Sequence, residues 1–268
     1  MPDYSYLMKG IKKVETESSV LVSSSRYLND ARVRDWVATQ LLRKNGSDIP
    51  TPSDSIQLVM ILREVQDIDQ INKLFAEERR KNPELDAWFK EGFSSSFMLD
   101  DLKKYDPETV GGIYYSQLSD NSLDVNIVPP FEPQNDFEYF QLRAGQTHDL
   151  EHIMGFGGFD FIGELVPYYM RLTNLFVHMS PELAGELSVF SILGSTRIIT
   201  RAVLHYPQTW LVCQNAMERG AKVGRDSAPI YTMKYEDVFD MTPEAAREAL
   251  GIKGAVYADT AAASAEWV

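Results

Sequence analysis

The sequence predicts an all-α fold, and three observations carry that prediction. Apolar residues recur three and four positions apart through most of the 268-residue chain, as they do on the buried face of a helix. Serine, aspartate or proline precedes several of these segments and glycine follows several, which is typical of helix starts and ends. No segment shows the β-branched alternation of a strand, and no internal repeat is present. We expect a single multi-helix domain over residues 26–252, after an N-terminal extension (1–25) and before a flexible tail (253–268).

The first half of the chain predicts a series of helices separated by short breaks. Val37 and Leu41 lie one turn apart in the first helix, and Asn45 with the glycine after it ends that segment. Asp54 can cap the second helix, and Pro83 both breaks the chain and starts the fourth. The predicted helices span residues 26–44, 55–65, 67–81, 83–92 and 107–118.

The second half begins after a connecting loop with three prolines, residues 121–136. Glycines 155, 157 and 158 separate a long helix from the next one, so that the two can reverse direction and pack together. Ser180 and Pro181 are suited to the cap and first turn of a further helix. The predicted helices span residues 136–154, 162–179, 180–206, 207–224 and 242–252.

Bulk composition excludes some function classes. The formal net charge is −13 and the basic residues form no cluster free of acids, so phosphate repulsion argues against a nucleic-acid partner. Cys213 is the only cysteine, which rules out an intrachain disulfide and suits a reducing compartment. No run of 18 apolar residues occurs, and the N-terminus has neither a signal-peptide core nor the acid-poor composition of a mitochondrial presequence. We expect a protein that is soluble or at most peripheral to a membrane.

The stretch 146–169 contains the strongest functional pattern. His148 and His152 are four residues apart, so a helix places them on one face, and Asp149 flanks the same patch. Glu164 lies early in the next helix and faces the pair if the two helices are antiparallel. Two imidazoles with one or two carboxylates suit Zn²⁺ or Fe²⁺, although a hydrogen-bonded polar seam in the core is the structural alternative. The pattern departs from the HExxH of zinc proteases, because Asp149 stands in place of the glutamate.

Other residues near this stretch admit two interpretations. Arg143 is either a solvated helix residue or a contact for an anionic ligand near the metal. His178 and His205 are expected at helix ends, and Cys213 in the core. A stripe rich in aromatic residues is either plain core or the lining of an apolar slot; it comprises Phe156, Phe159, Phe161, Tyr168, Tyr169, Met170, Phe176 and Met179.

The HDLEH segment, eleven intervening residues and Glu164 together form an HDxxH-x11-E pattern, which resembles the signature of the coenzyme Q (ubiquinone) biosynthesis protein four family. The segment YEDVFDMTPEAAREALGI (235–252) is similar to the closing pattern of that family. The two matches anchor residues 107–252. The first fifty residues and the alanine-rich tail carry no such resemblance.

The resemblance implies an all-helical protein with one divalent metal ion, Fe²⁺ or Zn²⁺, held by His148, Asp149, His152 and Glu164. It implies oxidative removal of the C1 carboxylate of a polyprenylated hydroxybenzoate and its replacement by hydroxyl, with Arg143 as a substrate contact and the aromatic stripe as a prenyl groove. The expected partners are a prenylated hydroxybenzoate or quinone intermediate, other ubiquinone-biosynthesis proteins and a membrane surface, and a homo-oligomer is expected. A bacterial member is expected in the cytoplasm, and a eukaryotic one on the matrix side of the mitochondrial inner membrane.

Two other functions remain open at this stage. A non-enzymatic scaffold would use the metal structurally and present prenylated lipids to partner enzymes. Hydrolysis at an HD-type metal site would need further ligands from other helices, and only His178 and His205 remain to supply imidazoles.

Overall fold

The computed structural model describes residues 23–42, 52–125 and 131–267, and no strand occurs among them. The predicted all-α class is confirmed. Most of the predicted N-terminal extension, residues 1–22, lies outside the described residues. The helices are α2 (Arg26–Asn29), α3 (Ala31–Leu42), α4 (Pro52–Val65), α5 (Ile68–Lys81), α6 (Pro83–Glu91), α7 (Leu99–Leu102), α8 (Val110–Asp120), α9 (Asp136–Gly155), α10 (Leu165–His178), α11 (Pro181–Leu187), α12 (Val189–His205), α13 (Trp210–Asp226), α14 (Pro243–Leu250) and α15 (Ala261–Ala265).

Local sequence explains many helix ends. The Asn82 side chain accepts hydrogen bonds from the first turn of α6, and Gly92 ends that helix in the left-handed region with φ of 60°. The predicted helix 180–206 is interrupted at Ser188, which terminates α11 through bonds to the Ala184 and Gly185 carbonyls before α12 begins. The first predicted helix is similarly divided at Asp30, where the backbone is extended.

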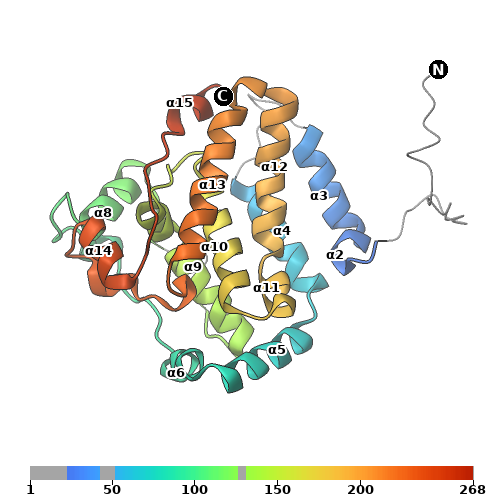
Figure 1. The fold of residues 1–268 in the computed structure, drawn as a ribbon, viewed down its shortest axis with the longest axis horizontal. Coiled ribbons are helices and arrows are strands. Elements are labelled where there is room, and N and C mark those ends of the chain that lie inside the picture. Colours follow the sequence, from blue (N-terminus) through green and yellow to red (C-terminus); the bar gives the residue numbers. More distant parts are fainter. Residues whose placement is uncertain (1–22, 43–51, 126–130, 268) are drawn as a thin grey trace, which may run out of the picture.

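Three helices, α10, α12 and α13, stand side by side in the middle of the molecule (Figure 1). Their closest contact joins α10 to α13, where glycine permits backbone approach. A β-carbon on Gly220 would lie 2.4 Å from the Val166 carbonyl oxygen, and one on Gly224 would lie 2.3 Å from that of Met170. A larger residue at either position would therefore separate the two helices.

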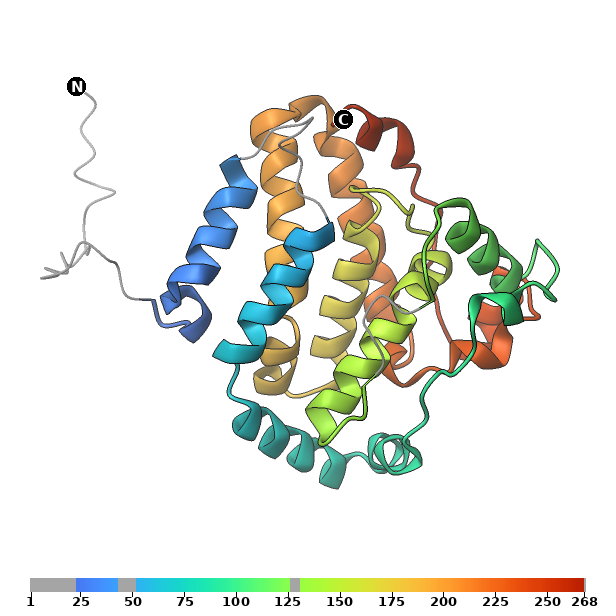
Figure 2. The same ribbon diagram turned by 180° about the vertical axis from the view of Figure 1, so that it is seen from behind.

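The remaining helices surround this central group. Helices α3 and α4 lie on one side of it, and α8 and α14 lie on the other (Figure 1). Seen from behind, α9 and α4 lie in front of the central helices (Figure 2). One buried cluster joins α8, α9 and α14, another joins α10, α12 and α13, and a third joins α5, α6, α9 and α11. Helix α9 therefore contributes to two of the clusters. A short loop connects the end of α9 to the start of α10.

The C-terminal tail differs from the flexible segment that its alanine-rich sequence predicts. Trp267 is only 1% exposed, and its ring stacks on Tyr206 with a centroid separation of 5.3 Å. Ala258 and Ala263 are buried in the same cluster. Small residues let the tail lie close against α12 and α13, and the single large aromatic side chain supplies the apolar area that holds it there.

Among the described residues, no single helix is long and apolar enough to cross a membrane. Helices α11 and α12 meet those criteria only when taken together, and they are bent by 58° at their junction.

Candidate metal centre

The last two turns of α9 and the residue before α10 bring three potential metal ligands together. His148 and His152 lie on one face of α9, and Glu164 directly precedes Leu165, the first residue of α10. Phe156 ends α9 with φ of 58°, which turns the chain into the glycine-containing loop 157–163. The eleven residues between His152 and Glu164 thus make a return loop, and the two helices meet at the predicted ligands.

The three side chains face one another. His148 Nε2 lies 3.3 Å from Glu164 Oε2, and His152 Nε2 lies 3.5 Å from Glu164 Oε1. Each residue offers one ligand atom, and these three atoms all lie within 4.8 Å of one another. These residues form a candidate metal-binding triad.

The other ring nitrogen of each histidine is held by an oxygen. His152 Nδ1 donates to the Gly158 carbonyl at 2.9 Å, and His148 Nδ1 lies 3.2 Å from Asp149 Oδ1. Phe159 stacks on the His152 ring at a centroid separation of 4.8 Å, and His152 is 1% exposed. Both imidazoles are therefore oriented with Nε2 toward Glu164, as metal-ligating histidines are oriented by their outer hydrogen bonds.

The electrostatics of the triad couple its members strongly. Burial lowers the pKa of His148, but the carboxylates of Glu164 and Asp149 outweigh it and raise the pKa to about 10. Burial raises the pKa of Glu164, but His152 and His148 together hold it well below its ordinary value. A divalent cation in the same position would replace the proton on His148 as the charge that balances Glu164.

The donor set fits a divalent metal. Two imidazoles and one carboxylate occur in catalytic zinc sites and in non-haem iron sites, and both leave coordination positions for a substrate or water. Asp149 was predicted as a ligand, but it is outside the triad and contacts His148 Nδ1 instead, a contact suited to orienting that imidazole. His178 and His205 lie elsewhere, each 2.9 Å from a backbone carbonyl oxygen, so they supply no ligand for hydrolytic chemistry of the HD type.

Comparison with known proteins identifies the family of the chain. The model of the coenzyme Q (ubiquinone) biosynthesis protein Coq4 family matches residues 93–255, which is more than half of the chain. The chain belongs to the Coq4 family. The resemblance seen in the sequence is therefore confirmed, and membership supports a role in ubiquinone biosynthesis.

A solved structure supports the fold of this Coq4 family member. A candidate ubiquinone biosynthesis protein from Nostoc punctiforme PCC 73102 has a TM-score of 0.57 and 21% sequence identity. The match covers 81% of this chain and 93% of the Nostoc chain. No protein with curated annotation matches the chain.

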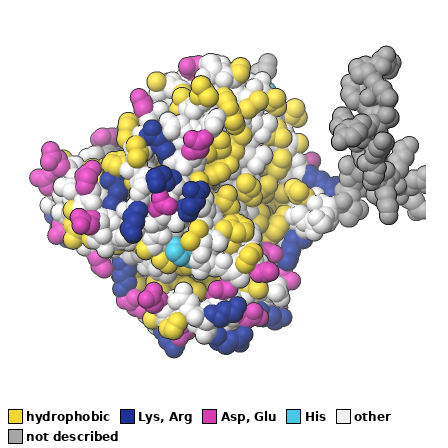
Figure 3. Space-filling view, viewed as in Figure 1, with side chains coloured by type: hydrophobic (Ala, Val, Ile, Leu, Met, Phe, Trp, Pro, Cys, Tyr) yellow, Lys and Arg dark blue, Asp and Glu magenta, His cyan; other side chains and the backbone are white. Residues whose placement is uncertain are grey.

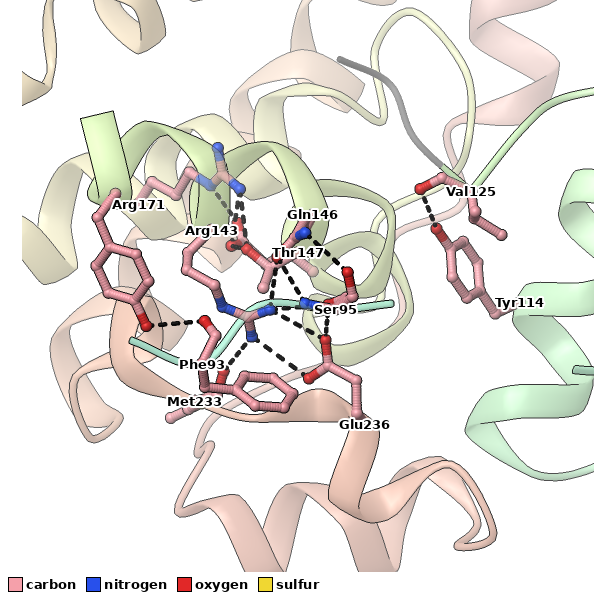
Figure 4. Close-up of polar contacts among 12 residues, drawn as sticks. Phe93, Ser95, Tyr114, Val125, Arg143, Gln146, Thr147, Arg171, Met233 and Glu236 are labelled. Atoms are coloured by element: carbon pink, nitrogen blue, oxygen red, sulfur yellow. Dashed lines mark hydrogen bonds and ion pairs between the residues drawn. The ribbon is translucent and has the colours of Figure 1, made fainter. Parts of the chain in front are cut away.

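In this Coq4 family member, Arg143 does not lie where the sequence analysis expected a substrate contact. Its side chain is 1% exposed and points toward Ser95, Glu236 and the Met233 carbonyl (Figure 4). Its guanidinium also lies 4.8 Å from the centre of the Phe93 ring. Arg143 joins the segment after α6 to the segment before α14, and it is not among the residues that line the cavity beside the triad.

That cavity has a volume of about 560 Å³ and opens next to His148 and Glu164. Phe159, Phe161 and Tyr168, three residues of the predicted aromatic stripe, line it. Its walls are otherwise mainly apolar; they include Ile56, Val59, Phe140, Leu175, Leu187 and Phe190. A volume of this size is typical of sites for small molecules and cofactors.

The other residues of the predicted stripe lie outside the cavity. Met170 is fully buried in the core, and Tyr169 is partly buried beside another core cluster. Each residue of a helix is rotated by about 100° from the one before it, so positions 169 and 170 face away from the wall that contains position 168. Phe156 caps α9, while Phe176 is 48% exposed and Met179 is buried.

Several charged residues of the cavity wall were not found from the sequence, among them Glu151, Arg171 and Arg197. Glu151 is 1% exposed and accepts from Arg171, whose Nη2 lies 2.9 Å from Glu151 Oε1. Arg197 on α12 also lines the cavity. A signal was available for Arg171, because it lies seven residues after Glu164 and so shares its face of α10. Arg197 comes from a helix far along the chain, and nothing in its local sequence indicates the cavity.

Proposed function

We propose that this Coq4 family member catalyses a metal-dependent step of ubiquinone biosynthesis, the oxidative decarboxylation of a polyprenylated hydroxybenzoate. The observation that carries the proposal is the position of the triad at the wall of a largely apolar cavity that also contains a buried arginine with no acidic partner among the described residues. A metal ligand set, an apolar slot and a fixed positive charge are the three features that an acidic aromatic ring with a hydrocarbon tail needs.

Arg197 supports the anionic part of the substrate. Its residue is 7% exposed, and its Nε and Nη1 atoms make no hydrogen bond. It forms no ion pair within the described part of the chain, and its guanidinium lies 5.5 Å from the centre of the Phe161 ring. A buried cation is costly unless an anion accompanies it, so a carboxylate in this cavity would be bound where the guanidinium is already desolvated. We assign Arg197 the role that the sequence analysis gave to Arg143.

The triad supports the oxidative step of the proposed reaction. His148, His152 and Glu164 would hold one divalent ion, and Fe²⁺ would supply an electron path between the ring and dioxygen that Zn²⁺ cannot supply. The overall change consumes the aromatic acid, dioxygen and a two-electron, two-proton reductant, and it yields the phenol, carbon dioxide and water. Phe159 and Phe161 would exclude bulk water from the reacting ring carbon.

The partners and location are part of the same proposal. A prenylated substrate that resides in a lipid bilayer requires peripheral contact with that bilayer, and the product must pass to other ubiquinone-biosynthesis proteins. We propose a cytoplasmic, membrane-associated homo-oligomer in a bacterium, or the matrix side of the mitochondrial inner membrane in a eukaryote.

A second candidate function is a non-enzymatic scaffold that binds a metal and a prenyl lipid and organises ubiquinone-biosynthesis enzymes. Apolar side chains gather on the face that contains the central helices (Figure 3). Leu211 is 74% exposed, Leu204 65% and Val203 49%. Exposed apolar groups of this kind are typical of surfaces that bind proteins or membranes.

The decisive experiment measures metal content and turnover together. Protein purified without added metal or chelator should contain about one metal ion per chain, and His152→Ala should lose that ion. After anaerobic reconstitution with iron, the protein should convert a prenylated hydroxybenzoate to the corresponding hydroquinone in the presence of dioxygen and a reductant.

The outcomes separate the two candidates. Iron-dependent turnover that His152→Ala abolishes supports the enzyme. Zinc that iron cannot replace, with tight binding of the prenylated ring and no turnover, supports the scaffold. Protein that binds no metal under either condition contradicts both, and the triad would then be a polar seam.

A further inference from the structure

The loop between the ligand-bearing helices is bonded to the C-terminal tail through Asp160. Asp160 Oδ1 accepts from the backbone N–H groups of Ile162 and Gly163 at 3.1 and 2.9 Å. Its other oxygen accepts from the Thr260 hydroxyl at 2.6 Å, and the Ser264 hydroxyl also donates to this carboxylate. One carboxylate therefore joins the loop to a segment about a hundred residues later.

The same contact reaches His152 through the peptide of Gly158. A β-carbon on Gly158 would lie 2.6 Å from the Thr260 hydroxyl and 2.3 Å from an Asp160 oxygen, so this glycine is packed directly against the tail. On its other side, the Gly158 carbonyl oxygen would lie 2.0 Å from a β-carbon at position 163. That oxygen is the acceptor for His152 Nδ1 at 2.9 Å. The position of the acceptor is therefore fixed between the tail and the start of α10.

The second connection reaches Glu164. The Glu164 N–H donates to the Asp160 backbone carbonyl at 3.1 Å, and the Ser264 hydroxyl accepts from the Ile162 N–H at 3.0 Å. These two contacts hold the backbone just before α10 and thus determine where α10 begins. The position at which α10 starts in turn determines where the Glu164 carboxylate lies relative to the two imidazoles.

The tail is itself anchored at its far end. Trp267 Nε1 donates to the Thr209 hydroxyl at 3.2 Å, and the Trp267 ring stacks on Tyr206. Nearer its start, the Ala258 N–H donates to the Phe156 carbonyl at 3.3 Å. The segment 258–267 is therefore attached to the end of α9, to the ligand loop and to the turn between α12 and α13.

We propose that residues 258–267 form a C-terminal clamp and that Asp160, Thr260 and Ser264 are positioning residues for the metal centre. The clamp holds the Gly158 carbonyl against His152 and fixes the start of α10 at Glu164, so it sets the arrangement of two of the three ligands. This inference rests on the metal centre of the proposed function, and it assigns a functional role to a segment that lies outside residues 93–255, the part of the chain matched by the family model.

The test uses the full chain with the paired substitution Thr260→Val and Ser264→Ala. Valine retains the shape of threonine, and the Ile162 N–H keeps its bond to Asp160, so the fold is expected to remain. Gln208→Ala is the matched control, because it removes the Gln208–Glu266 hydrogen bond from the same segment without contacting Asp160. The single substitution Thr260→Ser retains the hydroxyl that bonds Asp160 and should behave as the wild type.

The first readout is titration of metal-free protein with Co²⁺, followed by its visible ligand-field spectrum. Loss of an orienting contact around a metal ligand typically weakens metal affinity about 10- to 100-fold. We expect a loss of about tenfold in the paired variant, together with a changed spectrum, and neither change in Gln208→Ala or Thr260→Ser. A lower melting temperature with an unchanged spectrum and affinity would overturn the clamp.

The second readout needs no metal. In metal-free wild type, nitrogen-15 NMR should show the His152 proton on Nδ1 and slow exchange of that proton, because Gly158 accepts it. The paired variant should exchange it faster. If wild-type protein binds no metal, the metal centre fails; the clamp fails separately if the Nδ1 proton is unchanged in the paired variant.

Discussion

Two of the arginines that line the cavity, Arg171 and Arg197, should respond in opposite ways to the same substitution. Arg171 is paired with Glu151 through two nitrogens, at 2.5 and 2.9 Å, whereas Arg197 has no acidic partner in the described part of the structure. Both line the cavity next to the triad and both are largely buried. Replacement of each by methionine, which is similar in length and apolar, isolates the contribution of the charge.

For Arg197→Met, the substitution removes a desolvated cation whose effective penalty is several kcal/mol. It also removes the contact with the Phe161 ring, which contributes about 0.5–2 kcal/mol. The difference is a gain of about 1–3 kcal/mol in the free energy of unfolding. At roughly 2–4 °C per kcal/mol for a domain of this size, the melting temperature should rise by about 2–12 °C.

For Arg171→Met, the sign reverses because Glu151 would remain as an uncompensated buried carboxylate. Breaking a buried pair in this way costs about 3–5 kcal/mol, so the melting temperature should fall by about 6–20 °C. Arg171→Met is therefore the matched comparison for Arg197→Met, with the same chemical change in the same cavity.

The assay combines thermal unfolding of the metal-free variants with calorimetric binding of two ligands, a prenylated hydroxybenzoate and the prenylated phenol without its carboxylate. Arg197→Met should weaken binding of the carboxylated ligand by about 10- to 100-fold, which corresponds to the loss of about 1.5–3 kcal/mol of charged hydrogen bonding. Binding of the phenol should be unchanged. A melting temperature that falls as far as in Arg171→Met, or equal weakening of both ligands, would refute the assignment of Arg197 as an anion site.

Three further outcomes follow from the structure. Trp267→Ala should lower the free energy of unfolding by about 3–5 kcal/mol, measured by urea denaturation, because an almost fully buried ring is removed; a loss below 1 kcal/mol would show that the tail is not part of the core. Arg143→Met should cost about 3 kcal/mol by leaving Glu236 without its cation, and carboxylate affinity should stay unchanged, since Arg143 lies outside the cavity. In metal-free protein, the raised pKa of His148 adds stability that is fully present below pH 6.5 and is lost as the pH rises through about 10. The lowered pKa of Glu164 adds stability that is lost as the pH falls below 4.5. His148→Gln should remove this loss of stability at alkaline pH. If the stability of that variant falls with rising pH just as in the wild type, the pairing of His148 with Glu164 is contradicted.

The fold class and the centre of the site were predictable because both depend on short-range spacing. A separation of four residues on a helix places His148 and His152 one turn apart, whatever surrounds them. The glycines after α9 allow the reversal that returns Glu164 to the same end, so sequence separation could be converted into proximity. Asp149 was harder to assign, since a neighbour of His148 can bind a metal or orient the ring, and only the 3.2 Å contact with Nδ1 favours the second role.

The packing of the C-terminal tail could not be predicted from its local sequence. Alanine and serine predict little burial by themselves, and the residues that hold the segment in place are far away in the chain. Trp267 binds against Tyr206 and Thr209, and Thr260 binds Asp160. A single tryptophan at the end of a polar segment was the available signal, because burial of a ring of that size offsets the loss of conformational entropy of several residues.

Helical phase explains which parts of the cavity could have been derived and which could not. Glu164, Tyr168, Arg171 and Leu175 follow a three- and four-residue spacing, and all four line the cavity. Once Glu164 is taken as a ligand, its helix face predicts the cavity wall and separates Tyr168 from the neighbouring residues of the aromatic stripe. Arg197 is different, because its approach to the cavity depends on how α12 packs against α10, and that packing is set by the whole core. A ligand pair close in sequence can therefore be assigned from its spacing, whereas the charge that selects the substrate requires the three-dimensional structure.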